Sequence, residues 1–309
     1  MELGVHLPLA DLGQGLPSGR DLRSYAAVAA ELGFTAVAAN DHLVWRTPWL
    51  DGPTALAAVC GSTGRMRLVT SVALPVIRHP VVLAKGLAAL AALADGPVVA
   101  GLGPGSSRED HHLVGIPFEE RWARFDEALR SVRACLAGEP VPDGRFYQGG
   151  GAVLSPPASS VSVWSASWGS PARLRAVARD ADGWMASAFH IEPERFRSAR
   201  AELDTQLRAV GRDPAAFGDL VATTWLYVTE DRSVARRLVE DLLAPLLGRD
   251  PGNLAAHLPI GPPEHCARVL SDYADAGAGT VLLWPLGDPL RQFELVAETV
   301  RPRVVDRDP

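Results

Sequence analysis

The sequence is poor in cysteine, and its few cysteines form no recognisable set. The 309 residues include three, Cys60, Cys135 and Cys266, which are far apart and have no C-x-x-C spacing. This argues against a disulfide or zinc framework and predicts small buried thiols in a reducing compartment. The first twenty residues lack a basic start followed by an apolar run, so no secretory signal is expected. We therefore expect a cytoplasmic protein.

The sequence also lacks a long apolar run and an excess of basic residues. The most apolar stretch, residues 86–104, is interrupted by Asp95-Gly96-Pro97, which is typical of a turn between a helix and a strand. No membrane span is therefore expected. The net charge is -6, and the 30 Lys and Arg residues are scattered along the chain, which argues against a nucleic-acid partner.

What the sequence does contain is a regular alternation of strand-like and helix-like segments. Eight strands in about 300 residues predict one α/β domain over residues 1–309, a (β/α)8 TIM barrel, with a doubly wound open sheet as the alternative. The Gly-, Pro- and Ser-rich residues 137–160 predict an insertion after the fourth helix. The predicted strands are residues 3–8, 35–40, 66–74, 97–103, 160–166, 181–187, 220–229 and 280–286.

In such a barrel the residues that follow the strands gather at one mouth, where catalytic groups lie. Here they are mostly small and uncharged, as in Gly103-Pro104-Gly105-Ser106 and Ser167-Trp168-Gly169-Ser170. Backbone N–H groups at such residues can approach phosphate oxygens, and Pro171 is a typical first residue of a helix. The mouth therefore suits a flat organic cofactor with an anionic tail. A simple helix cap is an equally good interpretation of Ser170.

Asp41-His42 follow the second strand, and Trp45 comes three residues later. An imidazole can act as an acid or a base near neutral pH, and an indole can form a wall beside a planar ring. A structural hydrogen bond is the alternative role for His42. Among the other histidines, His79 is expected to cap the next helix, and His111 and His112 are expected to be solvated in a polar loop.

Two further patterns are weak evidence for a dinucleotide site or a metal site. A third raises the question of why an apolar strand should lead directly to a cation and an imidazole. GLGPG at residues 101–105 lacks the third glycine of a dinucleotide fingerprint, and no helix is expected to start there. His6, His42, His79 and His190 form no H-x-H or H-E-x-x-H pair, so no metal site is predicted. The strand within LVTSVALPVIRHP, residues 68–80, ends at a proline and is followed at once by Arg78-His79-Pro80.

Three segments together resemble the luciferase-like monooxygenase superfamily, which includes flavin-dependent luciferases and oxidoreductases dependent on the deazaflavin coenzyme F420. They are ALPVIRHPVVLAKGLAALAAL at residues 73–93, residues 101–136 beginning GLGPGSSRED, and RLRAVARDADGWMAS at residues 173–187. The resemblance extends over residues 2–303. One branch of sugar-phosphate dehydrogenases has a glutamate where this sequence has Ser106, and Trp168 replaces a residue that is commonly small.

The resemblance implies how these residues bind the cofactor. The third strand ends in a bulge with a cis peptide bond between Ser71 and Val72, which supports the middle of the cofactor ring. Asp41 contacts the cofactor, and His42 and Trp45 face the reacting centre. Gly103, Pro104, Gly105 and Ser106 lie along the ring edge, and Ser167, Trp168, Gly169 and Ser170 hold the phosphate.

The leading hypothesis is an enzyme that transfers a hydride between bound F420 and a small organic substrate, with His42 as acid or base. The nearest alternative is an FMN-dependent monooxygenase that uses reduced flavin and O2. The sequence also allows a metal-dependent hydrolase or a non-catalytic ligand-binding barrel. The alanine-rich outer helix at residues 80–94 suggests a homodimer, as the resemblance implies, with simple packing onto the barrel as the alternative.

Overall fold

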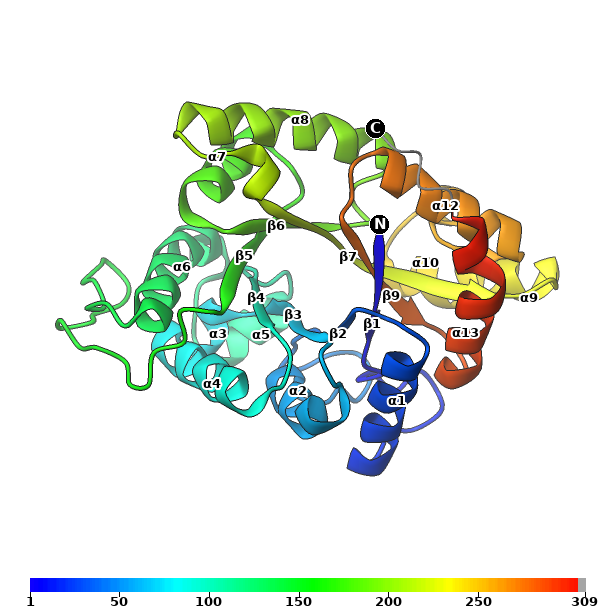
Figure 1. Cartoon of the computed structure of the whole chain (residues 1–309), viewed down its shortest axis with the longest axis horizontal. Coiled ribbons are helices and arrows are strands. Elements are labelled where there is room, and N and C mark those ends of the chain that lie inside the picture. Colours follow the sequence, from blue (N-terminus) through cyan, green and yellow to red (C-terminus); the bar gives the residue numbers. More distant parts are fainter. Residues whose placement is uncertain (305–309) are drawn as a thin grey trace.

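The computed structural model describes residues 1–304, without the side chains of residues 219–223. Within this range nine parallel strands form the sheet of a (β/α)8 barrel (Figure 1). The order is β6-β5-β4-β3-β2-β1-β9-β7-β8, and β6 also pairs with β7, which closes the ring and rules out the open sheet. The strands are β1 (Glu2–His6), β2 (Ala36–Ala39), β3 (Arg67–Ala73), β4 (Val98–Leu102), β5 (Ser162–Ala166), β6 (Gly183–Ser187), β7 (Gly218–Val228), β8 (Ile260–Gly261) and β9 (Thr280–Pro285).

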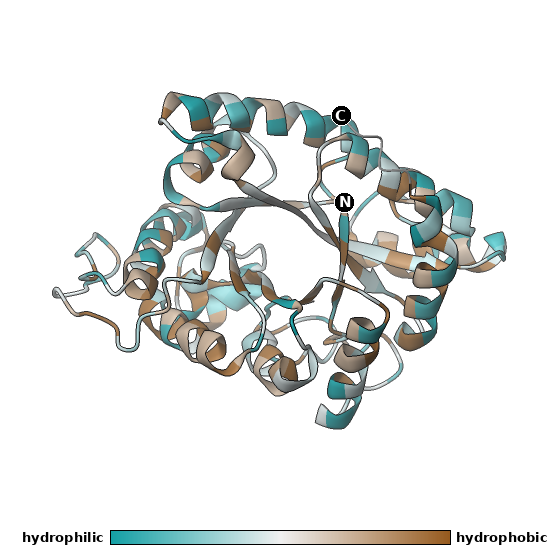
Figure 2. Ribbon diagram, viewed as in Figure 1, coloured by the Kyte–Doolittle hydropathy of each residue, from teal (hydrophilic) through white to brown (hydrophobic). Residues whose placement is uncertain are grey.

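All eight predicted strands are confirmed, and the two-residue β8 is an addition that pairs with the end of β7. Helices cover the outside of the barrel and turn their more hydrophobic sides towards the strands (Figure 2). They are α1 (Gly19–Glu31), α2 (Gly52–Val59), α3 (Pro75–Arg78), α4 (Pro80–Leu93), α5 (Arg108–Leu113), α6 (Arg121–Ala137), α7 (Pro171–Asp180), α8 (Pro193–Ala209), α9 (Arg232–Arg237), α10 (Ala244–Leu247), α11 (Pro251–His257), α12 (Pro263–Asp275) and α13 (Pro289–Leu295). A π-helical segment, Leu238–Leu243, joins α9 to α10.

Local sequence explains where these helices begin and end. Ser18 and Asp21 form a capping box at the start of α1, and α6 ends at Gly138 in the left-handed conformation. On α1, Leu22, Tyr25, Ala26 and Ala29 recur at helical spacing and are buried. The sequence therefore sets both the length of the helix and the face that it turns to the barrel.

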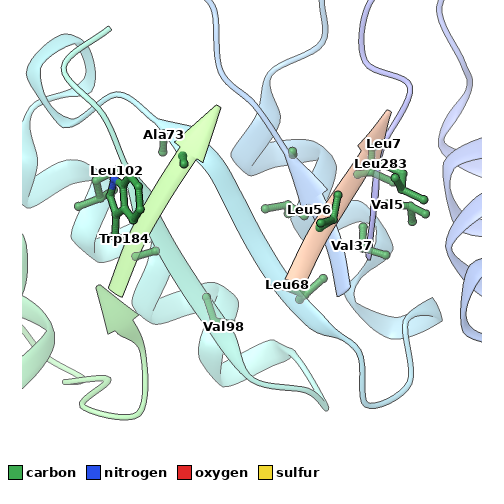
Figure 3. Packing of buried hydrophobic residues seen from close by; sticks show 14 of the residues in the cluster. Val5, Leu7, Val37, Leu56, Leu68, Ala73, Val98, Leu102, Trp184 and Leu283 are labelled. Atoms are coloured by element: carbon green, nitrogen blue, oxygen red, sulfur yellow. The ribbon is translucent and has the colours of Figure 1, made fainter. Parts of the chain in front are cut away.

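The core has an outer and an inner layer, because successive strand residues point to opposite faces. The outer layer lies between strands and helices and includes Val5, Val37 and Leu283 (Figure 3). Trp164 is the largest side chain of the inner layer. A Cβ on Gly183 or Gly218 would come within 2.3 or 2.2 Å of its ring, so both glycines make room for the indole. The inner layer consists of Ala36, Ala38, Val69, Val99, Trp164, Met185 and Leu282.

The remaining features of the fold bear on partners and on the predicted insertion. Cys60, Cys135 and Cys266 are free, and only the first is partly exposed. Of the helices in residues 1–304, none is both long and apolar enough to cross a membrane. Residues 138–161 form neither helix nor strand within the described chain and extend away from the barrel at the left of Figure 1. That this segment is an insertion stays a prediction.

Candidate active site

The inward-facing strand positions continue from the inner core layer to the carboxyl ends of the strands, where they line the mouth. Small residues stand near the ends of β3 and β4. Ser71 is the next inward position after Val69 on β3, and Gly103 is the second inward position after Val99 on β4. On the opposite side His6 ends β1 and Trp284 lies near the end of β9. The mouth therefore has a small side and an aromatic side.

The small side is shaped by an irregular end of β3. The pairing of β3 with β4 shifts register between Thr70 and Ala73, and the peptide bond between Ser71 and Val72 is cis, as the resemblance implies. A Cβ on Gly103 would lie 2.7 Å from Cγ2 of Val72, so only glycine fits beside the bulge. The hydroxyl of Ser71 is buried and has no hydrogen-bond partner among the described residues.

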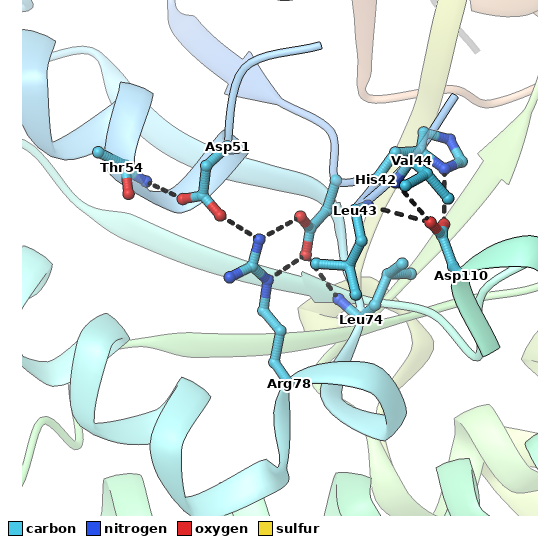
Figure 4. A network of polar contacts seen from close by, with 9 residues as sticks. His42, Leu43, Val44, Asp51, Thr54, Leu74, Arg78 and Asp110 are labelled. Carbon is cyan, nitrogen blue, oxygen red and sulfur yellow. Dashed lines mark hydrogen bonds and ion pairs between the residues drawn. The ribbon is translucent and has the colours of Figure 1, made fainter. Parts of the chain in front are cut away.

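Arg78 joins the bulge at the end of β3 to Asp41, which follows β2. This ion pair explains why an arginine comes so soon after the strand. Its guanidinium donates from Nε and Nη2 to the two carboxylate oxygens of Asp41 at 2.6 Å each, and also pairs with Asp51 (Figure 4). These bonds raise the pKa of Arg78, chiefly through Asp41. Asp41 also accepts the N–H of Leu74 at 3.3 Å. A buried ion pair therefore braces the strand end from outside the mouth.

The prediction that His79 caps the next helix is half right. His79 occupies the N-cap position of α4, but its side chain makes no capping hydrogen bond in the described structure. Its backbone has φ of 66°, and its ring instead meets Tyr147 edge-on at 5.4 Å. A residue in the left-handed conformation does not place its side chain as a usual N-cap does.

His42 is held by a carboxylate from a helix that the sequence did not predict. Its Nδ1 lies 2.9 Å from Oδ2 of Asp110 on α5, while Oδ1 of Asp110 accepts the N–H groups of Leu43 and Val44 (Figure 4). Burial favours a raised pKa for Asp110, but the bonds from His42 and the two amides outweigh it and lower the pKa. Since an ionised carboxylate only accepts hydrogen bonds, Nδ1 carries the proton and Nε2 is left to exchange one.

Helix α5 also corrects two statements made from the sequence. A helix does begin shortly after GLGPG, because Ser107 caps it by accepting the N–H of Asp110. His111 is fully buried rather than solvated, with its Nδ1 2.8 Å from the carbonyl of Ser107, whereas His112 is exposed as expected. The helix has six residues and little apolar periodicity, so polarity alone suggested a loop.

The loop predicted to hold a phosphate runs from the end of β5 into α7. Ser167 is buried, and its hydroxyl is 3.0 Å from the indole Nε1 of Trp184. Gly169 has φ of +69°. Ser170 occupies the N-cap position of α7, but its side chain makes no capping bond within the described residues. The first amides of α7 are therefore open to an anion, as the phosphate interpretation requires.

Trp168, in the same loop, is half-exposed and stacks on His190 with ring centroids 4.3 Å apart. Burial lowers the pKa of His190 to about 4, with smaller contributions from Arg249 and Arg195. The stacked imidazole is therefore neutral at neutral pH. Pro104 and Ser106 complete the loop after β4, in which Gly105 adopts φ of +84° beside His111.

The aromatic side of the mouth is built from rings in contact. Trp284 stacks on Trp225 at 4.1 Å and on His6 at 5.2 Å, and it meets Trp49 edge-on at 5.5 Å. Trp49 in turn contacts Trp45 and His42. His42 and Trp45, which were predicted as catalytic, lie 4.3 Å apart at the edge of this group. The predicted catalytic pair thus stands between the small and the aromatic sides.

The pKa of His6 tests whether this part of the barrel excludes solvent. The residue is fully buried, and burial lowers its pKa to about 3. An unfolded histidine has a pKa near 6.5, so between these values the unfolded state binds more protons and acidification destabilises the protein by up to about 1.4 kcal/mol per pH unit.

We expect that His6→Phe removes this contribution from the pH dependence of stability. The free energy of unfolding, measured by denaturant titration at pH 7, 6 and 5, will fall less steeply with acidification in the variant than in the parent. His112→Phe, at an exposed position, is the control and will keep the parent's slope. Equal slopes for His6→Phe and the parent would show that His6 is solvated.

The small side fits a flat ring with an anionic tail. The buried hydroxyl of Ser71, the backbone of Gly103 without a side chain, and the open amides of α7 provide a donor, a flat backbone surface and an anion site. These features stand at the ends of β3, β4 and β5, which are consecutive neighbours in the barrel. Within residues 1–304, no three His, Cys, Asp or Glu side chains are grouped as metal ligands.

The sequence is similar to known enzymes along most of its length. Residues 1–257 match the sequence profile of luciferase-like monooxygenases. The chain belongs to the luciferase-like monooxygenase family. Within the family it is 32% identical to an F420-dependent glucose-6-phosphate dehydrogenase of Beutenbergia cavernae, with 94% of each chain covered. A dehydrogenase of the same description from Kribbella flavida is 35% identical over 55% of this chain and 53% of its own.

Solved structures similar to this chain share the whole fold. The monooxygenase RslO1 of Streptomyces bottropensis is 25% identical, covers 99% of this chain and 100% of its own, and superposes with a TM-score of 0.84. An F420-dependent secondary alcohol dehydrogenase, solved with an F420-acetone adduct, has a TM-score of 0.83 at 18% identity, with 99% of each chain covered. The second likeness shows the fold alone.

The structure brings most of the sequence-predicted site residues together, and it adds others. Asp41, Ser71, Gly103 and Ser167 lie at the ends of four neighbouring strands, and Val72 contacts the position of Gly103. Their roles towards a cofactor stay predictions. Sequence reasoning missed Asp110 and, on the aromatic side, every ring except Trp45. The period of two along β1 and β9 was a usable signal, because it turns His6 and Trp284 inward with Gly4 and Leu282.

Proposed function

We propose that this chain is an oxidoreductase that binds the deazaflavin F420 on the small side of the mouth and transfers a hydride between it and a small organic substrate. The proposed cofactor slot is the strand end formed by Ser71, Val72 and Gly103, and the observation that carries the proposal is that this small strand end shares the mouth with an imidazole oriented by a buried carboxylate. Similarity to an F420-dependent dehydrogenase over 94% of the chain supports the choice of cofactor.

In this proposal the chain's own residues bind, orient and exchange a proton. When bound, the cofactor ring supplies the site that gains or loses the hydride. Val72 and Gly103 support its ring, Gly105 and Ser106 follow its edge, and the loop from Ser167 to Ser170 holds its phosphate. His42 takes the proton of a substrate hydroxyl on Nε2, or returns it in the reverse direction. Asp110 fixes the orientation and the tautomer of His42.

Cofactor titrations test this proposal. We expect F420 to bind the purified protein, measured by calorimetry, and Ala172→Asp to weaken binding at least about tenfold. Ala172 is exposed in the first turn of α7, so a carboxylate there repels a phosphate while it favours the helix. Ala172→Ser is the matched neutral control and will bind like the parent. Failure of both F420 and FMN to bind would reject the proposal.

An FMN-dependent monooxygenase is the second candidate, and two observations favour it. Ser106 stands where a branch of sugar-phosphate dehydrogenases has glutamate, and a monooxygenase superposes on the chain with a TM-score of 0.84. The same titrations separate the candidates, because tighter binding of FMN with oxygen consumption on adding reduced FMN and substrate supports the monooxygenase. Oxygen-independent reduction of F420 supports the dehydrogenase.

A homodimer and a cytoplasmic location are also part of the proposal. Helix α4 exposes Val82 and Leu93, whose exposed fractions are 66% and 65%, on the helix from which the sequence suggested a dimer. Free Cys60, Cys135 and Cys266 agree with a reducing compartment. A small-molecule substrate suits a mouth formed by the ends of the barrel strands.

A further inference from the structure

The aromatic side of the mouth has no role in cofactor binding as proposed above, yet it is the most distinctive part of the site. Five rings form it, and this group is called the aromatic half: His6, Trp45, Trp49, Trp225 and Trp284. They come from β1, from the segment after β2, and from the adjacent strands β7 and β9. The small side lies on β3, β4 and β5, so the small side and the aromatic half line different parts of the same mouth.

The position of His42 connects the aromatic half to the reaction. Its ring is 4.3 Å from that of Trp45 and 5.1 Å from that of Trp49. A substrate that exchanges a proton with His42 and a hydride with a ring on the small side must lie near both. The surface that remains available to the rest of that substrate is the aromatic half.

The shape and the polarity of the aromatic half indicate what kind of molecule it accepts. Trp225 and Trp284 are nearly parallel, with 21° between their planes, and Trp49 stands at 89° to Trp284. Trp225 lies between Trp284 and Phe189, whose ring is stacked on it at 6.3 Å, so the part-exposed Trp45 and Trp49 are the rings that offer a face or an edge to another flat ring. Trp225 is only 3% exposed, and its indole N–H, like that of Trp49, has no hydrogen-bond partner in the described part of the chain. These donors suit an oxygen atom carried on a ring.

Charge on the aromatic half argues against a sugar phosphate. The sequence contains one lysine, Lys85, which lies on α4 and donates to the carbonyl of Ser155. Arg46, beside Trp45 in sequence, donates to the carbonyl of Pro245. His6 is neutral because it is fully buried. A phosphate needs cations or open amides, whereas this wall offers neutral rings.

We propose that the aromatic half binds the substrate, and that the substrate is a flat, uncharged ring compound bearing a carbonyl or hydroxyl group rather than a sugar phosphate. This inference rests on the proposed function of the mouth and names its substrate class. The part-exposed Trp45 and Trp49 stack on the substrate, Trp225, Trp284 and His6 support them from behind, and the indole N–H groups of Trp49 and Trp225 donate to the substrate's oxygen or to a further polar group.

Equilibrium binding tests the inference without turnover. The fused-ring ketone 2-acetonaphthone is titrated calorimetrically into the protein with and without saturating F420, and glucose 6-phosphate is titrated in parallel. We expect the ketone to bind in both cases and glucose 6-phosphate not to bind. Trp225→Leu and the part-exposed Trp45→Leu will each weaken ketone binding about tenfold. Trp122→Leu, on the outer helix α6, is the tryptophan control and will bind like the parent.

The outcomes separate this inference from the proposed function. If F420 binds but the ketone does not, or glucose 6-phosphate binds instead, the substrate class is wrong. Displacement of the ketone by F420 would place it in the cofactor slot and overturn the inference. If the ketone binds with the expected tryptophan dependence and F420 does not bind, the cofactor proposal fails alone. Thermal unfolding checks the folding of each variant. If Trp225→Leu is unfolded, Trp45→Leu decides, and parent-like binding by it overturns the inference.

Discussion

Arg78→Met is expected to destabilise the protein by about 3–5 kcal/mol, because it removes the partner of a buried carboxylate. The side chain of Asp41 is 2% exposed, and among the described residues it keeps only the N–H of Leu74 once the guanidinium is gone. Neutralising the carboxylate as well, in Arg78→Met with Asp41→Asn, will restore part of the loss, since the two residues act as a pair. Denaturant unfolding at neutral pH measures all three proteins.

Asp51→Asn is the matched control, because it removes the other carboxylate of Arg78 at a half-exposed site. The side chain of Asp51 is 40% exposed, and asparagine caps α2 about as well as aspartate does. The expected loss is therefore at most about 1 kcal/mol. Equal small losses for Arg78→Met and Asp51→Asn would mean that the bulge at the end of β3 does not depend on Arg78.

His42→Ala is expected to lower the turnover number of the cofactor-loaded enzyme by about 10²- to 10⁴-fold, since it removes the group that exchanges a proton with the substrate. Asp110→Asn leaves the imidazole in place but disturbs its orientation and tautomer, and is expected to lower turnover by about 10- to 100-fold. Both variants will keep the parent's affinity for the cofactor, because neither residue belongs to the slot. Steady-state kinetics and calorimetry provide the two readings.

His112→Ala is the control for these variants, because it changes an exposed histidine on the same short helix as Asp110. It will keep parent-like turnover. The double variant His42→Ala, Asp110→Asn will be no slower than His42→Ala alone if the carboxylate acts through the imidazole. Independent, multiplying losses would assign Asp110 a separate role, and unchanged turnover in His42→Ala would exclude that residue as the acid or base.

The barrel was predictable because its signals are local. Each strand is a short apolar run, and helices such as α4 and α7 begin at prolines, as the sequence indicates. Helix α5 was missed because its six residues are nearly all polar, although Ser107 and Asp110 have the spacing of a capped first turn. Helix α13 was also not predicted, although Asp288 followed by Pro289 is a typical helix start, and Asp288 does cap it.

The site was only partly predictable, because its key pairs join residues distant in sequence. Asp110 is 68 positions from His42, and Arg78 is 37 from Asp41. No local pattern specifies such contacts, whereas the closing of the barrel does. Trp225 was hidden for another reason: β7 changes register against β9 between Val221 and Thr224, so the inward side cannot be counted along the whole strand.

The pairing of β1 with β9 has a consequence for how a cell makes this protein. Residues Glu2 to Val5 pair with Thr280 to Leu283, so this edge of β1 stays unpaired until nearly the whole chain has been translated. At about 5–20 residues per second, that delay is roughly 15–55 s. Throughout it, one edge of β1 and the neighbouring apolar strands are open to other nascent chains, which makes unfinished polypeptide, rather than the finished barrel, the species that chaperones must protect.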